Sequence, residues 1–218
     1  MNFSCIVRTL FPDLATTIKV QEHCCPDQYV GYISQIVKEK RIDPLCRKRA
    51  SCRPSHRAVL LILESPHVKE FEEHEGNPAP ARGQTGDNIA NYICKVLGLE
   101  TKTELPLILI NAVQFQCSLG VPIKSSGGNK SYRDSVFRAA WKDGGREDFQ
   151  KRLRDIYREG DLVVCSCTKG GGSPREHLRQ LVYEAIVDEL KSVDVQCVKH
   201  PVGWHWKGRS WTPLGQAS

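Results

Sequence analysis

The chain has 218 residues, of which 40% are hydrophobic and 26% are charged, and its formal net charge is +6. These values are typical of a globular protein with one α/β domain. The longest apolar runs, at residues 58–63 and 105–110, are too short to span a bilayer, which excludes a membrane-spanning helix. The basic excess permits binding to a polyanion but does not establish it.

The first residues lack a basic stretch followed by a sustained apolar run, so the sequence shows no signal peptide. We therefore expect a cytoplasmic protein, in which the ten cysteines are reduced thiols, some of them core residues. The cysteines and histidines of the N-terminal part lack the C-x₂₋₄-C spacing of common zinc sites, so we expect no metal.

Residues 1–57 differ from the rest and predict an N-terminal helical and basic extension that packs on the main domain. Residues 27–38 have apolar side chains at helical spacing, with a proline just before them. The following stretch, to residue 57, is rich in arginine, lysine and proline, and predicts a loop or an arm over the surface.

Residues 58–218 predict a second unit in which strands and helices alternate. Strands are expected at 58–63, 105–110, 162–165 and 193–198, and helices at 87–97, 131–142, 147–158 and 174–190, with Ser131 and Asp134 in capping-box spacing. Alternation of this kind favours right-handed crossovers. The predicted fold is α/β and doubly wound, with a short, about four-stranded parallel sheet and helices on both faces.

Polar residues follow each predicted strand. Glu64 follows the first strand, Asn111 the second, Lys169 closely follows the third, and His200 the fourth. Ligands of open parallel sheets bind outside the carboxyl ends of the strands. A carboxylate, an amide and a histidine are therefore expected to meet on one edge. Taken singly, each has a purely structural alternative, such as capping a helix or fixing a turn.

Four short blocks in this order resemble motifs of the uracil-DNA glycosylase superfamily. They are the ESPH of residues 64–67, the PARGQTG of residues 80–86, the LINAV of residues 109–113 and the HPVGW of residues 200–204. The resemblance covers about two-thirds of the chain. It implies an enzyme that flips a base out of DNA and hydrolyses its N-glycosidic bond without a cofactor.

The resemblance also assigns roles to individual residues. Glu64 would stabilise the sugar cation, and His200 would donate a hydrogen bond to the departing base anion. Base-binding residues would be Asn111, Ala81, Ser65 and His67. Asn111 offers one donor and one acceptor to a pyrimidine edge. DNA contacts would come from Arg82, Lys169, Lys199, Trp204, His205 and Trp206, with a tryptophan filling the gap in the base stack. Packing is the alternative for the tryptophans, and a solvated face for the basic residues.

Departures from the family pattern carry information as well. Ala81 stands where the family has an aromatic side chain that stacks on the base, which favours a roomier pocket and a bulky, modified pyrimidine over uracil. Cys117 is two residues too far from Asn111 for a cluster ligand, so no iron–sulfur cluster is expected.

The sequence thus predicts a monomeric, monofunctional DNA glycosylase, acting on double- or single-stranded DNA in repair or phage defence and away from membranes. Two alternatives remain open at this point. One is an inactive relative that only binds nucleic acid, and the other is a small-molecule enzyme such as a nucleoside hydrolase. The lack of G-x-G-x-x-G and P-loop motifs argues against a dinucleotide enzyme or an NTPase.

Overall fold

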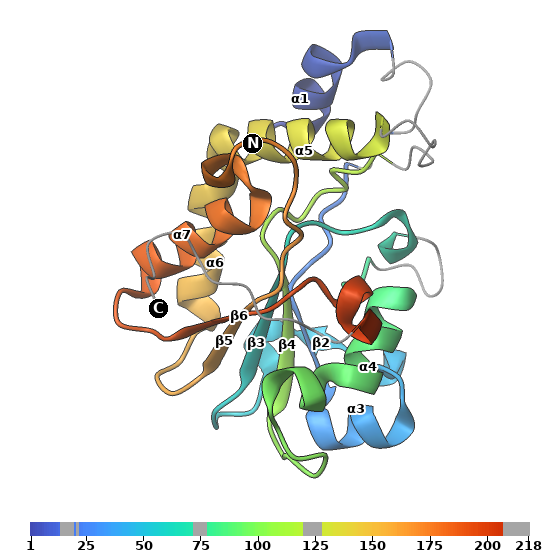
Figure 1. Cartoon of the computed structure of the whole chain (residues 1–218), viewed down its shortest axis with the longest axis vertical. Helices are drawn as coiled ribbons and strands as arrows, with labels where there is room; N and C mark the ends of the chain where they lie inside the picture. The colour runs from blue at the N-terminus through green and yellow to red at the C-terminus, as the bar shows by residue number, and fades with distance from the viewer. Residues whose placement is uncertain (14–19, 21, 72–77, 120–127, 207–218) are drawn as a thin grey trace.

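A six-stranded, mostly parallel sheet organises the residues that the computed structural model describes, which are 1–13, 20, 22–71, 78–119 and 128–206 (Figure 1). The strands lie in the order β2-β1-β4-β3-β5-β6. Their bounds are β1 Gln28–Tyr32, β2 Lys48–Arg49, β3 Val59–Leu63, β4 Pro106–Asn111, β5 Leu162–Cys165 and β6 Val195–Cys197. The protein is therefore of the mixed α/β class.

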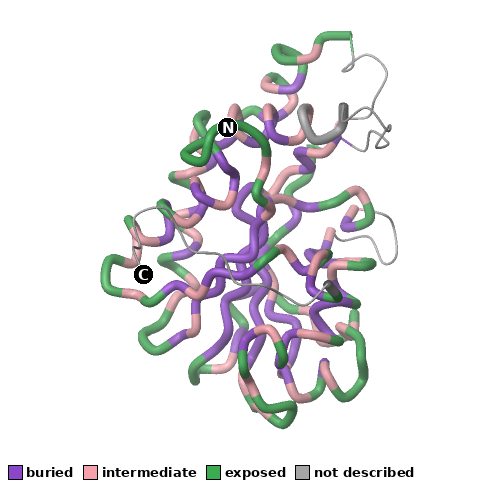
Figure 2. The backbone as a smooth tube through the Cα atoms, viewed as in Figure 1, coloured by how far each residue is buried: buried purple, intermediate pink, exposed green. Residues whose placement is uncertain are grey.

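Four parallel strands form the centre and one side of the sheet, close to the predicted positions. Strand β3 pairs with both β4 and β5, and β5 pairs with β6. In this register Leu63 lies beside Asn111, and Ile62 beside Cys165. Strands β3 and β4 are buried along their whole length (Figure 2), which explains their near-continuous apolar sequences.

The expectation of about four strands was wrong, because the N-terminal part contributes two more. Strand β1 pairs antiparallel with β4, and β2 pairs antiparallel with β1. The predicted helix at 27–38 is in fact strand β1 followed by helix α3, Ile33–Glu39. Gly31, with φ of +109°, lies where the register of β1 shifts, in a conformation that other residues rarely adopt. The apolar spacing that favoured one helix ran across this junction.

Helices cover both faces of the sheet (Figure 1). Alternate strand residues belong to two core clusters, one packed against α5, α6 and α7 and the other against α3 and α4. Besides α3, the described α-helices are α1 Phe3–Leu10, α4 Gln84–Leu97, α5 Gly128–Ala140, α6 Arg146–Ile156 and α7 Leu178–Leu190. Short helical turns are η1 Pro44–Cys46, η2 Ala50–Cys52, η3 Val68–Glu70, the π-type turn η4 Trp141–Gly145, η5 Pro174–Glu176 and η6 Pro201–Trp206.

The helix starts differ from the predicted ones. Helix α4 begins three residues earlier than expected, with Gly83 at its N-cap and Asp87 in its first turn. Helix α5 begins at Gly128, so Ser131 lies inside the helix and is not its cap. A capping box forms instead at Ser173 and Glu176, where the side chain and backbone of each residue bond the other.

A buried ion pair ties the N-terminal part to the sheet. The Arg53 guanidinium bonds both carboxylate oxygens of Asp161, at 2.5 and 2.7 Å. Asp161 also accepts hydrogen bonds from the backbone N–H groups of Ala58, at 2.8 Å, and Arg158, at 2.9 Å. The side chains of both ion-pair partners are almost fully excluded from solvent. The pair therefore fixes residues 50–53 beside the start of β5.

Candidate functional site

The carboxyl ends of the parallel strands form the candidate site. Strand β3 continues toward α4 on one face of the sheet, whereas its neighbours β4 and β5 continue toward α5 and α7 on the other face. Chains that leave adjacent strands in opposite directions open a crevice between them. Glu64 directly follows β3, Thr168 follows β5 and His200 follows β6, so all three lie at this end of the sheet.

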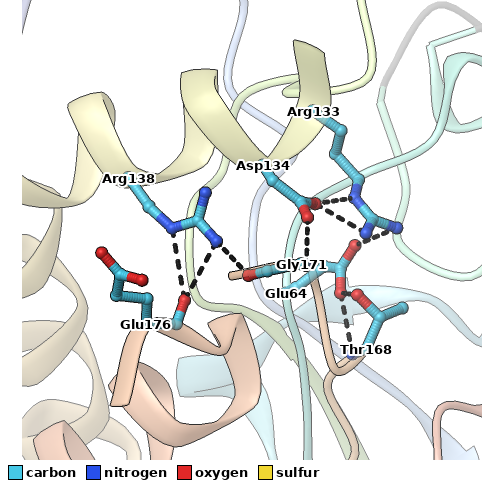
Figure 3. Close-up of polar contacts among 7 residues, drawn as sticks. All are labelled: Glu64, Arg133, Asp134, Arg138, Thr168, Gly171 and Glu176. Carbon is cyan, nitrogen blue, oxygen red and sulfur yellow. Dashed lines mark hydrogen bonds and ion pairs between the residues drawn. The ribbon is translucent and has the colours of Figure 1, made fainter. Parts of the chain in front are cut away.

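Glu64 is a buried carboxylate with fixed partners (Figure 3). It is 4% exposed, and its Oε2 accepts hydrogen bonds from the backbone N–H of Thr168, at 2.8 Å, and from the Thr168 hydroxyl. Its Oε1 forms an ion pair with Arg133 Nη1 at 3.3 Å. A carboxylate offers about four acceptor positions, two on each oxygen. Arg133 occupies one position of Oε1, so about one remains there for another donor. Sequence reasoning did not find Arg133 or Thr168.

A polar network extends from Glu64 along helix α5 (Figure 3). Arg133 also bonds Asp134, at 2.7 and 2.8 Å, and Asp134 Oδ2 accepts the backbone N–H of Gly171 at 2.6 Å. Arg138, one turn further along, donates to the carbonyl oxygens of Gly171 and Glu176. These bonds hold the loop after β5 against α5, and they fix Thr168 at the Glu64 carboxylate.

His200 presents a neutral imidazole near Glu64. Its Nδ1 accepts the backbone N–H of Val202 at 3.3 Å, which places the ring proton on Nε2. Burial lowers the pKa of His200, the charge of Glu64 raises it and the charge of Arg133 lowers it. The neutral form therefore dominates at pH 7, and Nε2–H can act as a hydrogen-bond donor.

Asn111 ends β4 at the same edge, but its side chain bonds other groups. It is 1% exposed, and its Nδ2 donates to Glu70 Oε2 at 3.5 Å and to Cys25 Sγ at 3.7 Å. Its Oδ1 is buried and has no hydrogen-bond partner within the described part of the chain. As expected, Glu64, Asn111 and His200 all lie at the ends of strands on the same edge of the sheet. Among the described residues, the side-chain contacts of Asn111 and those of Glu64 form two separate sets.

Glu70, the partner of Asn111, is another buried carboxyl group that the sequence did not reveal. Burial raises its pKa to about 7, although hydrogen bonds from the backbone of Ala81 and from the side chains of Asn111 and Cys25 oppose the shift. Cys25, whose pKa burial also raises, contacts Glu70 Oε2 at 3.7 Å. Glu70 stands among several acidic residues in the sequence, and nothing local distinguishes it from them.

We expect Glu70 to make stability depend on pH. Between pH 4.5, its ordinary pKa, and about 7, the folded protein holds a proton that the unfolded chain has released, so stability falls as pH rises through this range. Glu70→Gln mimics the protonated form and should be more stable than wild type by roughly 1–3 kcal/mol at pH 8. The difference should nearly vanish at pH 4. Urea unfolding at both pH values measures it, with Glu159→Gln at an exposed position as the control. An equal difference at both pH values would contradict the assignment.

The other predicted base-binding residues have structural roles. Ala81 is buried in the core cluster that packs on α4 and has a φ of +55°. Ser65 bonds the buried thiol of Cys117. His67 is exposed, and its Nδ1 accepts the backbone N–H of Lys69 at 3.3 Å. Their contacts with a base stay a prediction.

The predicted DNA contacts divide into exposed and buried residues. Trp204 is 2% exposed, packs with α4 in the core and donates its indole N–H to the Lys199 carbonyl at 2.6 Å. It is therefore a core residue in this structure, because the turn η6 folds it inward onto α4, and its role as a wedge stays a prediction. His205, Lys169 and Lys199 are exposed, and Arg82 is half-buried. The side chain of Trp206 lies outside the described residues.

Comparisons with protein-family models, with curated proteins and with solved structures find no match to this chain. Across the residues that the structure describes, no helix is long and apolar enough to cross a membrane. The same residues contain no group of three or more histidine, cysteine, aspartate or glutamate side chains arranged to hold a metal ion. All ten cysteines are free.

Proposed function

We propose that this protein is a monofunctional DNA glycosylase that hydrolyses the N-glycosidic bond of a pyrimidine nucleotide. One observation carries the proposal: an ion-paired carboxylate, Glu64, and a neutral histidine, His200, lie at the same end of the sheet. The order of the motif blocks that resemble the uracil-DNA glycosylase superfamily supports it as well.

The two side chains match the charges that develop when this bond breaks. As the bond from C1′ to the base lengthens, the sugar gains positive charge and the base leaves as an anion. The ionised Glu64 would stabilise the sugar, and the remaining acceptor position of Oε1 would orient the attacking water. His200 Nε2–H would donate to the base anion without transferring a proton. Water adds at C1′, its released proton passes to solvent, and the base then takes a proton from solvent.

Fixed partners make Glu64 suitable for this task. Thr168 and Arg133 hold the carboxylate before any substrate binds, so little reorganisation is needed as the charge develops. Arg133 also counters the negative charge of Glu64, which allows an anionic DNA strand to approach. The fixed loop after β5 carries the exposed Lys169, which would contact a phosphate.

Incubation of the protein with DNA strands that carry different bases tests the proposal. The panel holds uracil, mismatched thymine and cytosines with small and large 5-substituents, in duplex and single-stranded form. Alkali cleavage should reveal an abasic site for at least one base, and the prediction of a bulky pyrimidine expects the most cleavage with a large 5-substituent. DNA binding without cleavage would instead support an inactive relative. Release of bases from free nucleosides alone would support a nucleoside hydrolase.

A further inference from the structure

A second pocket lies between the N-terminal part and the start of α4. Its volume is 320 Å³, and its lining includes neither Glu64 nor His200. Three segments far apart in the sequence form its wall: the turn before β2, the short helix after β3 and the loop that enters α4. The lining residues are Arg41, Ile42, Pro44, Arg47, Lys69, Ala81, Arg82, Gly83, Gly86 and Asp87.

The charges of this pocket are strongly unbalanced. Four of the lining side chains are cations, whereas Asp87 is the one carboxylate among the described residues of the lining. The pKa of Arg47 is lowered to about 10, mainly by burial and to a lesser extent by the charge of Arg82. Glu70 opposes the shift only in part. A bound anion would relieve this repulsion.

Hydrogen bonds fix one of these cations, Arg47, and a second, Lys69, lies close to the start of α4. Arg47 Nη1 donates to the Pro80 carbonyl at 2.8 Å and to Gln28 Oε1 at 3.0 Å, and no other hydrogen bond of this guanidinium occurs within the described chain. Lys69 lies over the N-cap of α4, since a Cβ built on Gly83 would be 3.1 Å from Lys69 Cδ and 4.0 Å from its Nζ. Cations at a helix N-terminus are unfavourable unless an anion joins them.

Only glycine fits at position 86, in the first turn of α4. A Cβ on Gly86 would lie 2.1 Å from the carbonyl oxygen of Ala81, so the loop 81–86 folds back onto the first turn of α4. This close approach brings Arg82 and the first turn of the helix to the same pocket as Lys69. The cations therefore reach one pocket from three separate segments of the chain.

We propose that this pocket binds a phosphate group carried on a sugar. Guanidinium groups bond phosphate oxygens in pairs, and an ammonium group adds a point charge. The volume is at the lower end of the range of small-molecule pockets and exceeds the need of a bare phosphate ion. The phosphate ester would come either from a nucleic acid strand or from a small phosphorylated sugar. The proposal does not depend on the glycosylase activity proposed above.

Titration calorimetry of the full chain with ribose 5-phosphate and inorganic phosphate tests the proposal. Lys69→Glu and Arg41→Glu change exposed side chains of the lining, so both variants should fold normally, as thermal unfolding would verify. Each should weaken ribose 5-phosphate binding about tenfold or more, because a charge-assisted bond is lost and a repulsion added. Lys95→Glu, at an exposed position in the last turn of α4, is the matched control and should bind like wild type.

Short DNA strands with and without a 5′-phosphate distinguish the two sources. If the pocket serves nucleic acid, DNA affinity should fall in the Lys69 variant, and ribose 5-phosphate should compete with DNA. If it serves a small molecule, DNA affinity should stay unchanged while ribose 5-phosphate binding is lost. No saturable binding of any of these probes to wild type would overturn the proposal. Equal loss in the Lys95 control would also overturn it, since the effect would then be general electrostatics.

Discussion

Replacing Glu64 with glutamine is expected to slow base excision about a hundredfold or more, the usual cost of losing one preorganised electrostatic group. The amide keeps the size of the side chain but carries no charge to stabilise the sugar cation. It also loses the ion pair with Arg133, which then remains with Asp134 as its carboxylate partner. Single-turnover rates on the best substrate of the base panel measure the effect.

Binding measurements separate this catalytic role from a structural one. DNA affinity of Glu64→Gln should stay near that of wild type or rise slightly, because a negative charge has been removed near the phosphates. Glu159→Gln, at an exposed position before β5, removes one charge elsewhere and should leave the rate unchanged. An unchanged excision rate in Glu64→Gln, with the fold intact, would refute the role assigned to Glu64.

Replacing Arg53 with alanine is expected to lower the free energy of unfolding by about 3 kcal/mol or more. The change leaves the Asp161 carboxylate buried without its cation, and burial of an unpaired charge is costly. The backbone N–H groups of Ala58 and Arg158 still bond Asp161, so they offset part of the cost of burying its charge. Urea unfolding followed by circular dichroism measures the loss.

Arg49 supplies the matched control for this experiment. It belongs to the same basic stretch as Arg53 but is exposed on strand β2, so Arg49→Ala should change stability by less than about 0.5 kcal/mol. Similar losses in the two variants would show that the buried pair is not the source of the effect. Arg53→Lys should recover only part of the stability, since lysine cannot bond both carboxylate oxygens.

The basic stretch before β3 shows how local composition can mislead. Its charge predicted a solvated arm, yet Arg53 is buried and β2 adds an edge to the sheet. Composition reports the average environment of a segment, whereas the partner of Arg53 lies 108 residues further along the chain. Similarly, the apolar spacing around Tyr29 could not reveal that a strand ends at Tyr32 and a helix begins at Ile33.

A strand that is buried on both faces must be apolar along its length. The apolar runs of the sequence therefore located the four parallel strands, and with them the polar residues that follow each strand. Glu64 and His200 were placed at one end of the sheet by this reasoning alone. The tertiary structure decided which polar side chains meet there. Glu64 accepts a hydrogen bond from Thr168, 104 residues further along the chain. Asn111 donates a hydrogen bond to Glu70, and Trp204 packs in the core. These contacts join segments that are distant in the sequence. Burying a charge or an amide is unfavourable unless it has hydrogen-bond partners, and only the folded chain brings those partners together.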